Sequence, residues 1–309
     1  MRSLVYVSQC STGRTTGEPS EGVLTGMCGR YAASANPDEL IEAFDVDLDA
    51  TAEPARSVLA NPQTPPPGAP DFNMAPTKQA PVILMRSPRG QAEETESAPA
   101  APVRQLRLLT WGLVPSWSKD VKTGVRMINA RSETVLTSRA FAPAARSRRC
   151  LVPARGWYEW QESPVAKDAK GKPRKQPFFV ESGSSELIAF AGLYEFWRGP
   201  EIPESTDPMA WLTTFTIITT AADPGLDRIH DRQPLVLDPG DWAGWLDPSV
   251  TDGDDIADLL RFHAPGRFRA HPVSRAVSGN RANGPQLIEP APAEELVGVV
   301  DPSTGEIIG

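Results

Sequence analysis

Short apolar runs, separated by segments rich in proline and glycine, constrain the fold of this chain more than any other sequence feature. Runs of this length, bounded by turn residues, are typical of β-strands. Helix signals are few and short, and strands and helices do not alternate as they do in parallel sheets. The pattern predicts an α+β fold with a curled antiparallel sheet. The predicted strands are 81–85, 106–111, 176–181, 187–193 and 215–219, and the predicted helices begin near Asn36, Asp241 and Asp254.

Three segments with the composition of surface loops interrupt this pattern. Residues 47–70 carry acids and then a proline cluster, residues 86–104 are rich in alanine, proline and glutamate, and residues 161–176 are rich in lysine. Such composition predicts loop insertions.

The two ends of the chain lack the regular apolar runs that predict strands and helices in the middle. Residues 1–26 are rich in serine, threonine and glycine, and Met27 is itself a plausible initiator, so we expect a disordered extension or a mis-assigned start. Residues 285–309 are rich in proline and glutamate, which predicts a loose tail. One domain is therefore expected over residues 27–284.

Charge and cysteine content narrow the functional class. The net charge of −8 indicates that any nucleic-acid contact needs a local basic face. Three cysteines are too few for a disulfide framework, and no Cys/His pairs have the spacing of metal ligands. No apolar run approaches the ~20 residues of a membrane helix. We expect a cytoplasmic monomer without a membrane anchor, metal or cofactor.

Cys28 is the first candidate for chemistry. A cysteine in a first strand is commonly a small core residue. Here it follows Met27, and an initiator methionine is commonly removed before a small residue. The mature chain would then begin with a cysteine, whose α-amine has a pKa of about 8 and can condense with an aldehyde. The neighbouring thiol can then close a five-membered thiazolidine.

Asn129 and Arg131 lie together in one polar motif. Asn129 fits a helix N-cap, but it also offers a donor and an acceptor to a small polar group. Arg131 offers a planar fork suited to phosphate.

Glu159 and His230 are candidates for proton transfer. Glu159 is flanked by Tyr158 and Trp160, and an apolar setting would raise its pKa, although an exposed glutamate at a strand end fits equally well. His230 lies in a polar segment after an apolar run, where catalytic groups are frequent.

Arginines are concentrated between residues 126 and 155. This segment holds seven arginines and one acid, Glu133, for a local charge of +6 in an acidic chain. Trp111, Trp117, Phe141 and Trp157 lie in or beside it. Basic residues with stacking aromatics suit single-stranded nucleic acid, whereas the alternative is a solvated basic face over core tryptophans.

Seven motifs follow one another between residues 27 and 277. They are MCGRY at 27–31, NMAPT at 73–77, WGLVPSW at 111–117, NARSET at 129–134, CLVPARGWYEW at 150–160, AGLYE at 191–195, and the segment 219–234. Together they resemble the SRAP family, the SOS response-associated peptidases or abasic-site processing proteins. The resemblance implies a bifurcated antiparallel sheet curled into a pseudo-barrel with short helices.

The resemblance also implies a function and a site. It implies a protein of the DNA damage response that crosslinks itself to abasic sites in single-stranded DNA through lyase-type Schiff-base chemistry. It also implies that the protein associates with the nucleoid when it is bound to DNA, and that it removes the residues before the cysteine by autoproteolysis. Four residues match catalytic positions: Cys28 as nucleophile, Asn129 as the orienting residue, and Glu159 and His230 as the proton-transfer pair. Four more match DNA contacts: Arg30 and Arg131 at phosphates, and Pro76 and Trp111 near the bases.

Two features depart from the family pattern. The 26 residues before Met27 would block the amine of Cys28, so translation must start at Met27 or the extension must be removed. Gln233 stands where methionine is expected, a change that we expect to affect packing more than chemistry.

Two other functions fit parts of the sequence. A cysteine peptidase would use Cys28 as thiolate and His230 as base, with Glu159 or Asn129 in support, and needs no free amine. A noncatalytic single-stranded nucleic-acid binding module would use the arginines and aromatics and be indifferent to Cys28.

Overall fold

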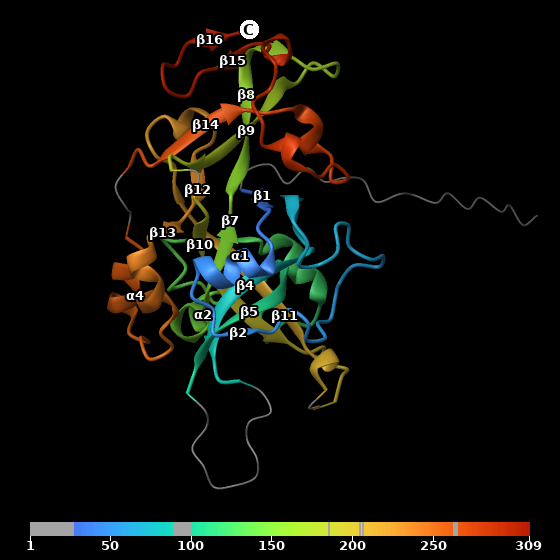
Figure 1. The fold of residues 1–309 in the computed structure, drawn as a ribbon, viewed down its shortest axis with the longest axis vertical. Coiled ribbons are helices and arrows are strands. Elements are labelled where there is room, and N and C mark those ends of the chain that lie inside the picture. Colours follow the sequence, from blue (N-terminus) through green and yellow to red (C-terminus); the bar gives the residue numbers. More distant parts are fainter. Residues whose placement is uncertain (1–27, 89–100, 185, 204, 206, 262–264) are drawn as a thin grey trace, which may run out of the picture.

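The computed structural model describes residues 28–88, 101–184, 186–203, 205, 207–261 and 265–309 (Figure 1). The predicted extension at 1–26 and most of the predicted loop at 86–104 lie outside these residues. Among the described residues, no helix has the length and apolar character to cross a membrane.

Five strands close into a barrel. Around the ring, β7 pairs with β4, β4 with β5, β5 with β11, β11 with β10, and β10 with β7. The β5–β11 pairing is parallel and the other four are antiparallel, so the barrel is mixed. The predicted α+β fold with a curled sheet is confirmed. The barrel strands are β4 (Gln79–Arg86), β5 (Val103–Trp111), β7 (Arg149–Ala154), β10 (Ile188–Trp197) and β11 (Leu212–Ala221).

Smaller strands extend the barrel sheet. The parallel pairings of β2 with β5 and of β6 with β11 add to its mixed character, while β12 and β13 pair antiparallel with β11 and β10. Their bounds are β2 (Leu48–Asp49), β6 (Asn129–Arg131), β12 (Arg232–Pro234) and β13 (Val236–Leu237).

A second sheet stands above the barrel in Figure 1, in the order β14-β9-β8-β1-β3. The chain leaves the barrel at the end of β7 and enters this sheet after Arg155, which is the bifurcation that the family resemblance implies. Gly156 is required at this branch, because a Cβ there would lie 2.3 Å from the carbonyl oxygen of Val180. The strands are β1 (Arg30–Ala33), β3 (Asp71–Met74), β8 (Gly156–Lys167), β9 (Pro173–Ser182) and β14 (Phe268–Pro272).

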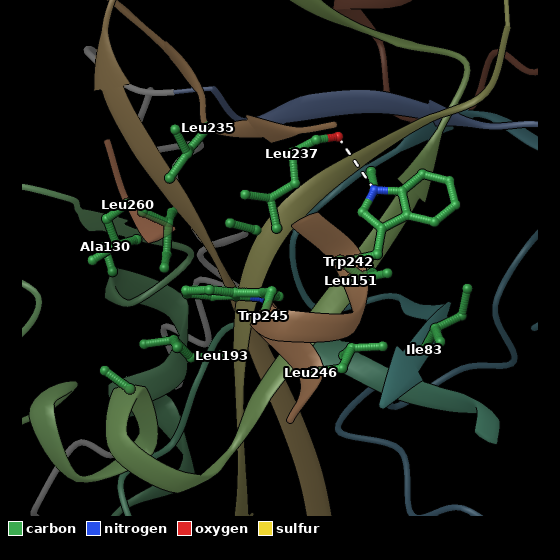
Figure 2. Close-up of a cluster of buried hydrophobic side chains, with 14 of the residues drawn as sticks. Ile83, Ala130, Leu151, Leu193, Leu235, Leu237, Trp242, Trp245, Leu246 and Leu260 are labelled. Atoms are coloured by element: carbon green, nitrogen blue, oxygen red, sulfur yellow. Dashed lines mark hydrogen bonds between the residues drawn. The ribbon is translucent and has the colours of Figure 1, made fainter. Parts of the chain in front are cut away.

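Short helices flank the barrel. The helix α1 begins with the expected N-cap, because Asn36 and Glu39 form a reciprocal capping box. In α3 the rings of Trp242 and Trp245 pack on barrel residues such as Leu151 (Figure 2). The helices are α1 (Pro37–Ala43), α2 (Ala142–Ser147), α3 (Trp242–Leu246) and α4 (Gly253–Leu259), with 3-10 turns η1 (Val121–Arg126), η2 (Pro208–Ala210), η3 (Leu226–Arg228), η4 (Pro239–Asp241), η5 (Arg275–Ser278), η6 (Pro285–Leu287) and η7 (Ala293–Glu295).

Two segments differ from their predicted loop character. Residues 161–176 form the outer halves of β8 and β9 and the turn between them, because Gln161 and Gln176 are buried and paired across the hairpin. The predicted tail 285–309 contains β15 (Val299–Val300) and β16 (Ile307–Ile308), which pair with each other. It packs against β8 because Leu287 and Val299 are apolar and 1% exposed. The prediction of a loose tail is therefore wrong.

Candidate functional site

Cys28 lies two residues before the start of β1, between the barrel and the second sheet. The antiparallel register pairs Arg30 with Tyr158, so the preceding residues come beside Glu159. Cys28 is 2% exposed and belongs to the same apolar cluster as Trp111 and other barrel residues. The cysteine thus lies at the inner edge of the junction between the two sheets.

Asn129 ties this segment to the barrel. It opens β6, where it pairs with Ile217 of β11, and its side-chain Nδ2 donates a hydrogen bond of 2.9 Å to the backbone carbonyl of Cys28. Its Oδ1 is buried and accepts no hydrogen bond from the described residues. A buried acceptor without a donor costs folding free energy. This atom is therefore suited to accept a hydrogen bond from a ligand, or from a free N-terminal amine on Cys28.

Glu159 faces the thiol of Cys28. Burial raises the pKa of the Glu159 carboxyl to about 8, and the charge of Asp231 adds to this, while a hydrogen bond with the Cys28 side chain opposes it. Its Oε1 is a second buried acceptor without a partner among the described residues. Burial and the charge of Glu159 raise the pKa of the Cys28 thiol well above its usual value. At neutral pH this arrangement favours a neutral thiol and a protonated carboxyl.

His230 lies on the loop between β11 and β12. Its Nδ1 accepts a hydrogen bond of 3.0 Å from the backbone N–H of Arg232, which leaves the proton of the neutral ring on Nε2. The ring is 18% exposed and its Nδ1 lies 3.2 Å from Asp231 Oδ1. Among the described residues, no hydrogen bond joins His230 to Cys28 or Glu159. The predicted catalytic set is therefore partly assembled: three members interact, and His230 lies on the adjoining loop.

The predicted DNA contacts are placed in different ways. Arg131 is exposed at the end of β6, and Pro76 is half-buried after β3. Arg30 is half-buried, and its Nη1 donates to Asn73 Oδ1 at 2.8 Å and to the carbonyl of Val277 at 3.1 Å. Arg30 therefore anchors the second sheet to the segment after β14 in this structure.

Trp111 requires a correction. It is 1% exposed, its Nε1 donates to the carbonyl of Ile128 at 2.8 Å, and its ring stacks on Phe215 inside the barrel. A direct contact between Trp111 and a DNA base is therefore excluded in this conformation. The ring lies at the end of β5 among buried apolar residues of the barrel, so packing determines its position.

Trp117, at the end of the same motif, is an exposed aromatic that the sequence analysis placed beside the arginines but did not assign to a DNA contact. It is 50% exposed, and the guanidinium of Arg139 lies 5.0 Å from its ring centroid. An exposed tryptophan paired with an arginine is typical of a stacking platform for a nucleic-acid base. Its position shortly before the arginine-rich segment 126–155 was the available signal.

Arg232 is a second residue that sequence reasoning missed. Its Nη1 and Nη2 bond to the carboxylate of Glu133 at 2.6 and 3.0 Å, and its positive charge acts on the Cys28 thiol. No sequence motif singled out this pair, because its partners are far apart in the chain. Within the described ranges, no group of three His, Cys, Asp or Glu side chains could hold a metal ion.

The fold and site define a class of protein: a mixed barrel with a second sheet, and a buried cysteine where they meet, held by an asparagine and a glutamic acid. The family model described as "SOS response associated peptidase (SRAP)" matches residues 27–280. The chain therefore belongs to the SRAP family, as its motifs predicted.

Several named proteins are similar to this chain. "Abasic site processing protein YoqW" of Bacillus subtilis (strain 168) is 35% identical, covering 85% of this chain and 99% of that protein. "Abasic site processing protein YedK" of Escherichia coli (strain K12) is 32% identical, covering 85% and 100%. "Abasic site processing protein HMCES" of Rattus norvegicus is 29% identical, covering 86% and 76%.

A solved structure is also similar. The crystal structure of a phage-related protein from Bordetella bronchiseptica has a TM-score of 0.52 and 28% sequence identity, covering 80% of this chain and 95% of that one. The similarity supports the fold assignment.

Proposed function

We propose that this protein processes abasic sites in single-stranded DNA by forming a covalent thiazolidine link through Cys28. The observation that carries the proposal is the set of contacts around this residue. Asn129 holds its carbonyl at 2.9 Å, and Glu159, with a pKa of about 8, faces its thiol. The names of the similar proteins identify abasic sites as the class of substrate.

The chemistry needs a free α-amine on Cys28. Asn129 Oδ1 and Glu159 Oε1, which have no hydrogen-bond donor in the described part of the chain, support such a state, because a terminal amine has more N–H donors to offer than a peptide bond at Cys28. The amine arises if translation starts at Met27 and the methionine is removed, or if the residues before Cys28 are cleaved off. Autoproteolysis at that bond is one route to the same state.

The proposed reaction consumes the aldehyde of the ring-opened sugar. The amine of Cys28 adds to the aldehyde carbon, and loss of one water gives the imine. The thiol sulfur then adds to the imine carbon, and its proton is transferred to the nitrogen, which yields the thiazolidine. Glu159 donates a proton to the departing hydroxyl, recovers one from the nitrogen as the imine forms, and then relays the thiol proton to that nitrogen. The Nε2–H of neutral His230 is proposed to donate a hydrogen bond to the ring oxygen as the sugar opens, while solvent water carries the proton of the anomeric hydroxyl to that oxygen.

The DNA-binding face is proposed to use exposed groups. Arg131 is assigned to a phosphate, Trp117 with Arg139 to a base, and the half-buried Pro76 to an apolar edge of the DNA. The exposure of the Trp117 ring favours unpaired bases, whose faces are open to stacking. A cysteine peptidase is less well supported, because a raised thiol pKa disfavours the thiolate that such an enzyme needs.

Intact mass spectrometry with an abasic single-stranded oligonucleotide tests the proposal. A chain that begins at Cys28 should gain the mass of the oligonucleotide minus one water, and a matched oligonucleotide without the abasic site should give no adduct. A chain that keeps residues 1–27 should give none. Adduct formation by that extended chain, or turnover of an unrelated peptide by it, would favour other chemistry.

Two variants separate the roles of amine and thiol. Cys28→Ala keeps the terminal amine, so it should give only a labile imine that borohydride traps. Cys150→Ala is the matched control, because Cys150 is also buried but lies inside the barrel strand β7, and it should crosslink like the parent. A stable adduct on Cys28→Ala without borohydride would contradict the thiazolidine.

A further inference from the structure

Gln161 connects three parts of the chain that are distant in sequence. Its Nε2 donates to the carbonyl of Arg228 at 3.1 Å and to the carbonyl of Val300 at 2.9 Å, and its Oε1 accepts from the Val300 N–H at 2.8 Å. Gln161 is 2% exposed and lies two residues after Glu159 on β8, so the two side chains share one face of the strand. One buried amide thus links the strand of Glu159, the turn before His230 and the C-terminal strand β15.

Apolar packing joins the same three parts. Phe178 of β9 lies opposite Glu159 in the β8–β9 register. Its ring packs with Ile229, the residue before His230, and with Val299 of β15, and all three are less than 10% exposed. The backbone of the His230 loop is therefore fixed against the C-terminal hairpin by side chains that exclude water.

The tip of the loop touches the C-terminal turn directly. Arg228 Nη1 donates to the carbonyl of Ser303 at 3.4 Å and, over a shorter distance, to that of Pro302. Gly225 opens the 3-10 turn η3 with a φ of +96°, and a Cβ there would lie 3.1 Å from the Pro302 carbonyl oxygen. The close approach and the left-handed conformation both favour glycine at this position.

We propose that Gln161 and the C-terminal hairpin β15–β16 are positioning elements for His230, holding its loop beside the strand that carries Glu159. The hairpin lies beyond residues 27–280, which the family model matches, and it stands beside β8 (Figure 1). The inference rests on the proposed function of His230 in crosslinking. Gln161 acts through the loop and does not touch the reacting atoms.

The test is Gln161→Met in the full chain that begins at Cys28. Methionine has a similar length but cannot form the three hydrogen bonds. The maximal rate of crosslinking should fall roughly tenfold, since misplacement of a group by about 1 Å can cost up to about a hundredfold. The DNA concentration that gives half of this rate should stay within about twofold, because no DNA contact is lost.

Two further variants serve as a control and as a second test. Glu162→Gln changes the neighbouring side chain, which is 58% exposed and paired with Lys175, and should crosslink like the parent. Arg228→Ala removes the contact with the C-terminal turn from an exposed position, so it tests the proposal if Gln161→Met does not fold. An unchanged maximal rate in both Gln161→Met and Arg228→Ala would overturn the proposal.

A double variant separates positioning from general support of the fold. In a His230→Ala background, Gln161→Met should cause no further loss of rate, because the group that it positions is gone. An additive loss would show that Gln161 acts elsewhere.

Hydrogen exchange gives a readout that needs no DNA. The N–H groups of Ile229 and His230, which both bond to the Leu226 carbonyl, should exchange faster in Gln161→Met than in Glu162→Gln. Equal exchange would overturn the proposal even if the parent protein crosslinks. Faster exchange with no crosslinking by the parent would instead reject the proposed function and leave the structural link in place.

Discussion

The side-chain amide of Asn129 donates a 2.9 Å hydrogen bond to the backbone carbonyl of Cys28, across 101 positions of sequence. The bond fixes the segment before β1 to β6 of the barrel, and both partners are buried. It therefore sets the direction in which the thiol and the backbone nitrogen of Cys28 point.

Replacement of Asn129 should impair both crosslinking and stability. In Asn129→Leu the buried carbonyl of Cys28 loses its donor, which should cost about 1–3 kcal/mol in the free energy of unfolding. The crosslinking rate should fall by about tenfold or more, because the nucleophile is no longer oriented. Asn36→Ala is a suitable control, since loss of that N-cap costs a comparable ~1 kcal/mol far from the site. Equal crosslinking rates in the two variants would contradict an orienting role.

Glu159 should make the protein less stable as the pH rises. Its pKa is about 8 in the folded chain against an ordinary 4.5, so the folded state retains a proton that the unfolded state has lost. This contribution is complete below pH 4.5 and is lost as the pH rises through about 8, with a slope of at most about 1.4 kcal/mol per pH unit.

The variant Glu159→Gln isolates this contribution. It resembles the protonated side chain, so the difference in unfolding free energy between variant and parent should shift in favour of the variant between pH 5 and pH 8. Denaturant titrations at the two pH values measure it. A difference that stays constant over this interval would mean that Glu159 ionises at its ordinary pKa.

Trp117 and Trp111 should respond to substitution in opposite ways. Trp117→Ala removes an exposed ring and should weaken noncovalent binding of single-stranded DNA by about 1–3 kcal/mol, with little effect on stability. Trp111→Ala empties a space in the barrel core and should cost about 3–5 kcal/mol of stability. Fluorescence anisotropy and thermal unfolding distinguish the two effects. Unchanged affinity in Trp117→Ala would remove this ring from the DNA-binding face.

The sequence predicted the elements of the barrel better than their connections. Every predicted strand falls on an observed one, because buried strands need continuous apolar residues and the flanking turns need proline and glycine. The parallel β5–β11 pairing that closes the barrel joins residues such as Thr110 and Thr214. Residues so far apart in the sequence pair without leaving any local pattern that a single sequence could reveal.

The sequence named the residues of the candidate site but not their arrangement. Cys28, Asn129 and Glu159 were found from their motifs, and the structure brings them together. Exposure was the quantity that motifs could not supply: Trp111 and Trp117 stand in one motif, and only long-range packing decides which ring is buried. The C-terminal hairpin was missed because its strands are only two residues long and its order comes from contacts with β8.

Gln233 should stabilise the His230 loop through its hydrogen bonds with Asp223. Its Nε2 donates to Asp223 Oδ1 at 2.8 Å, and its Oε1 accepts from the Asp223 N–H at 2.9 Å. Both residues are 4% exposed. In Gln233→Met the buried carboxylate of Asp223 loses this donor, so the free energy of unfolding should fall by about 1–3 kcal/mol.

The double variant Asp223→Leu with Gln233→Met controls for this interpretation. When both partners become apolar, no buried carboxylate remains, and part of the lost stability should return. Chemical denaturation of the parent, Gln233→Met and the double variant gives the comparison. A double variant less stable than Gln233→Met would show that Asp223 stabilises the loop chiefly through another contact, for which the N–H of Gly266, at 3.4 Å from Asp223 Oδ2, is the nearest candidate.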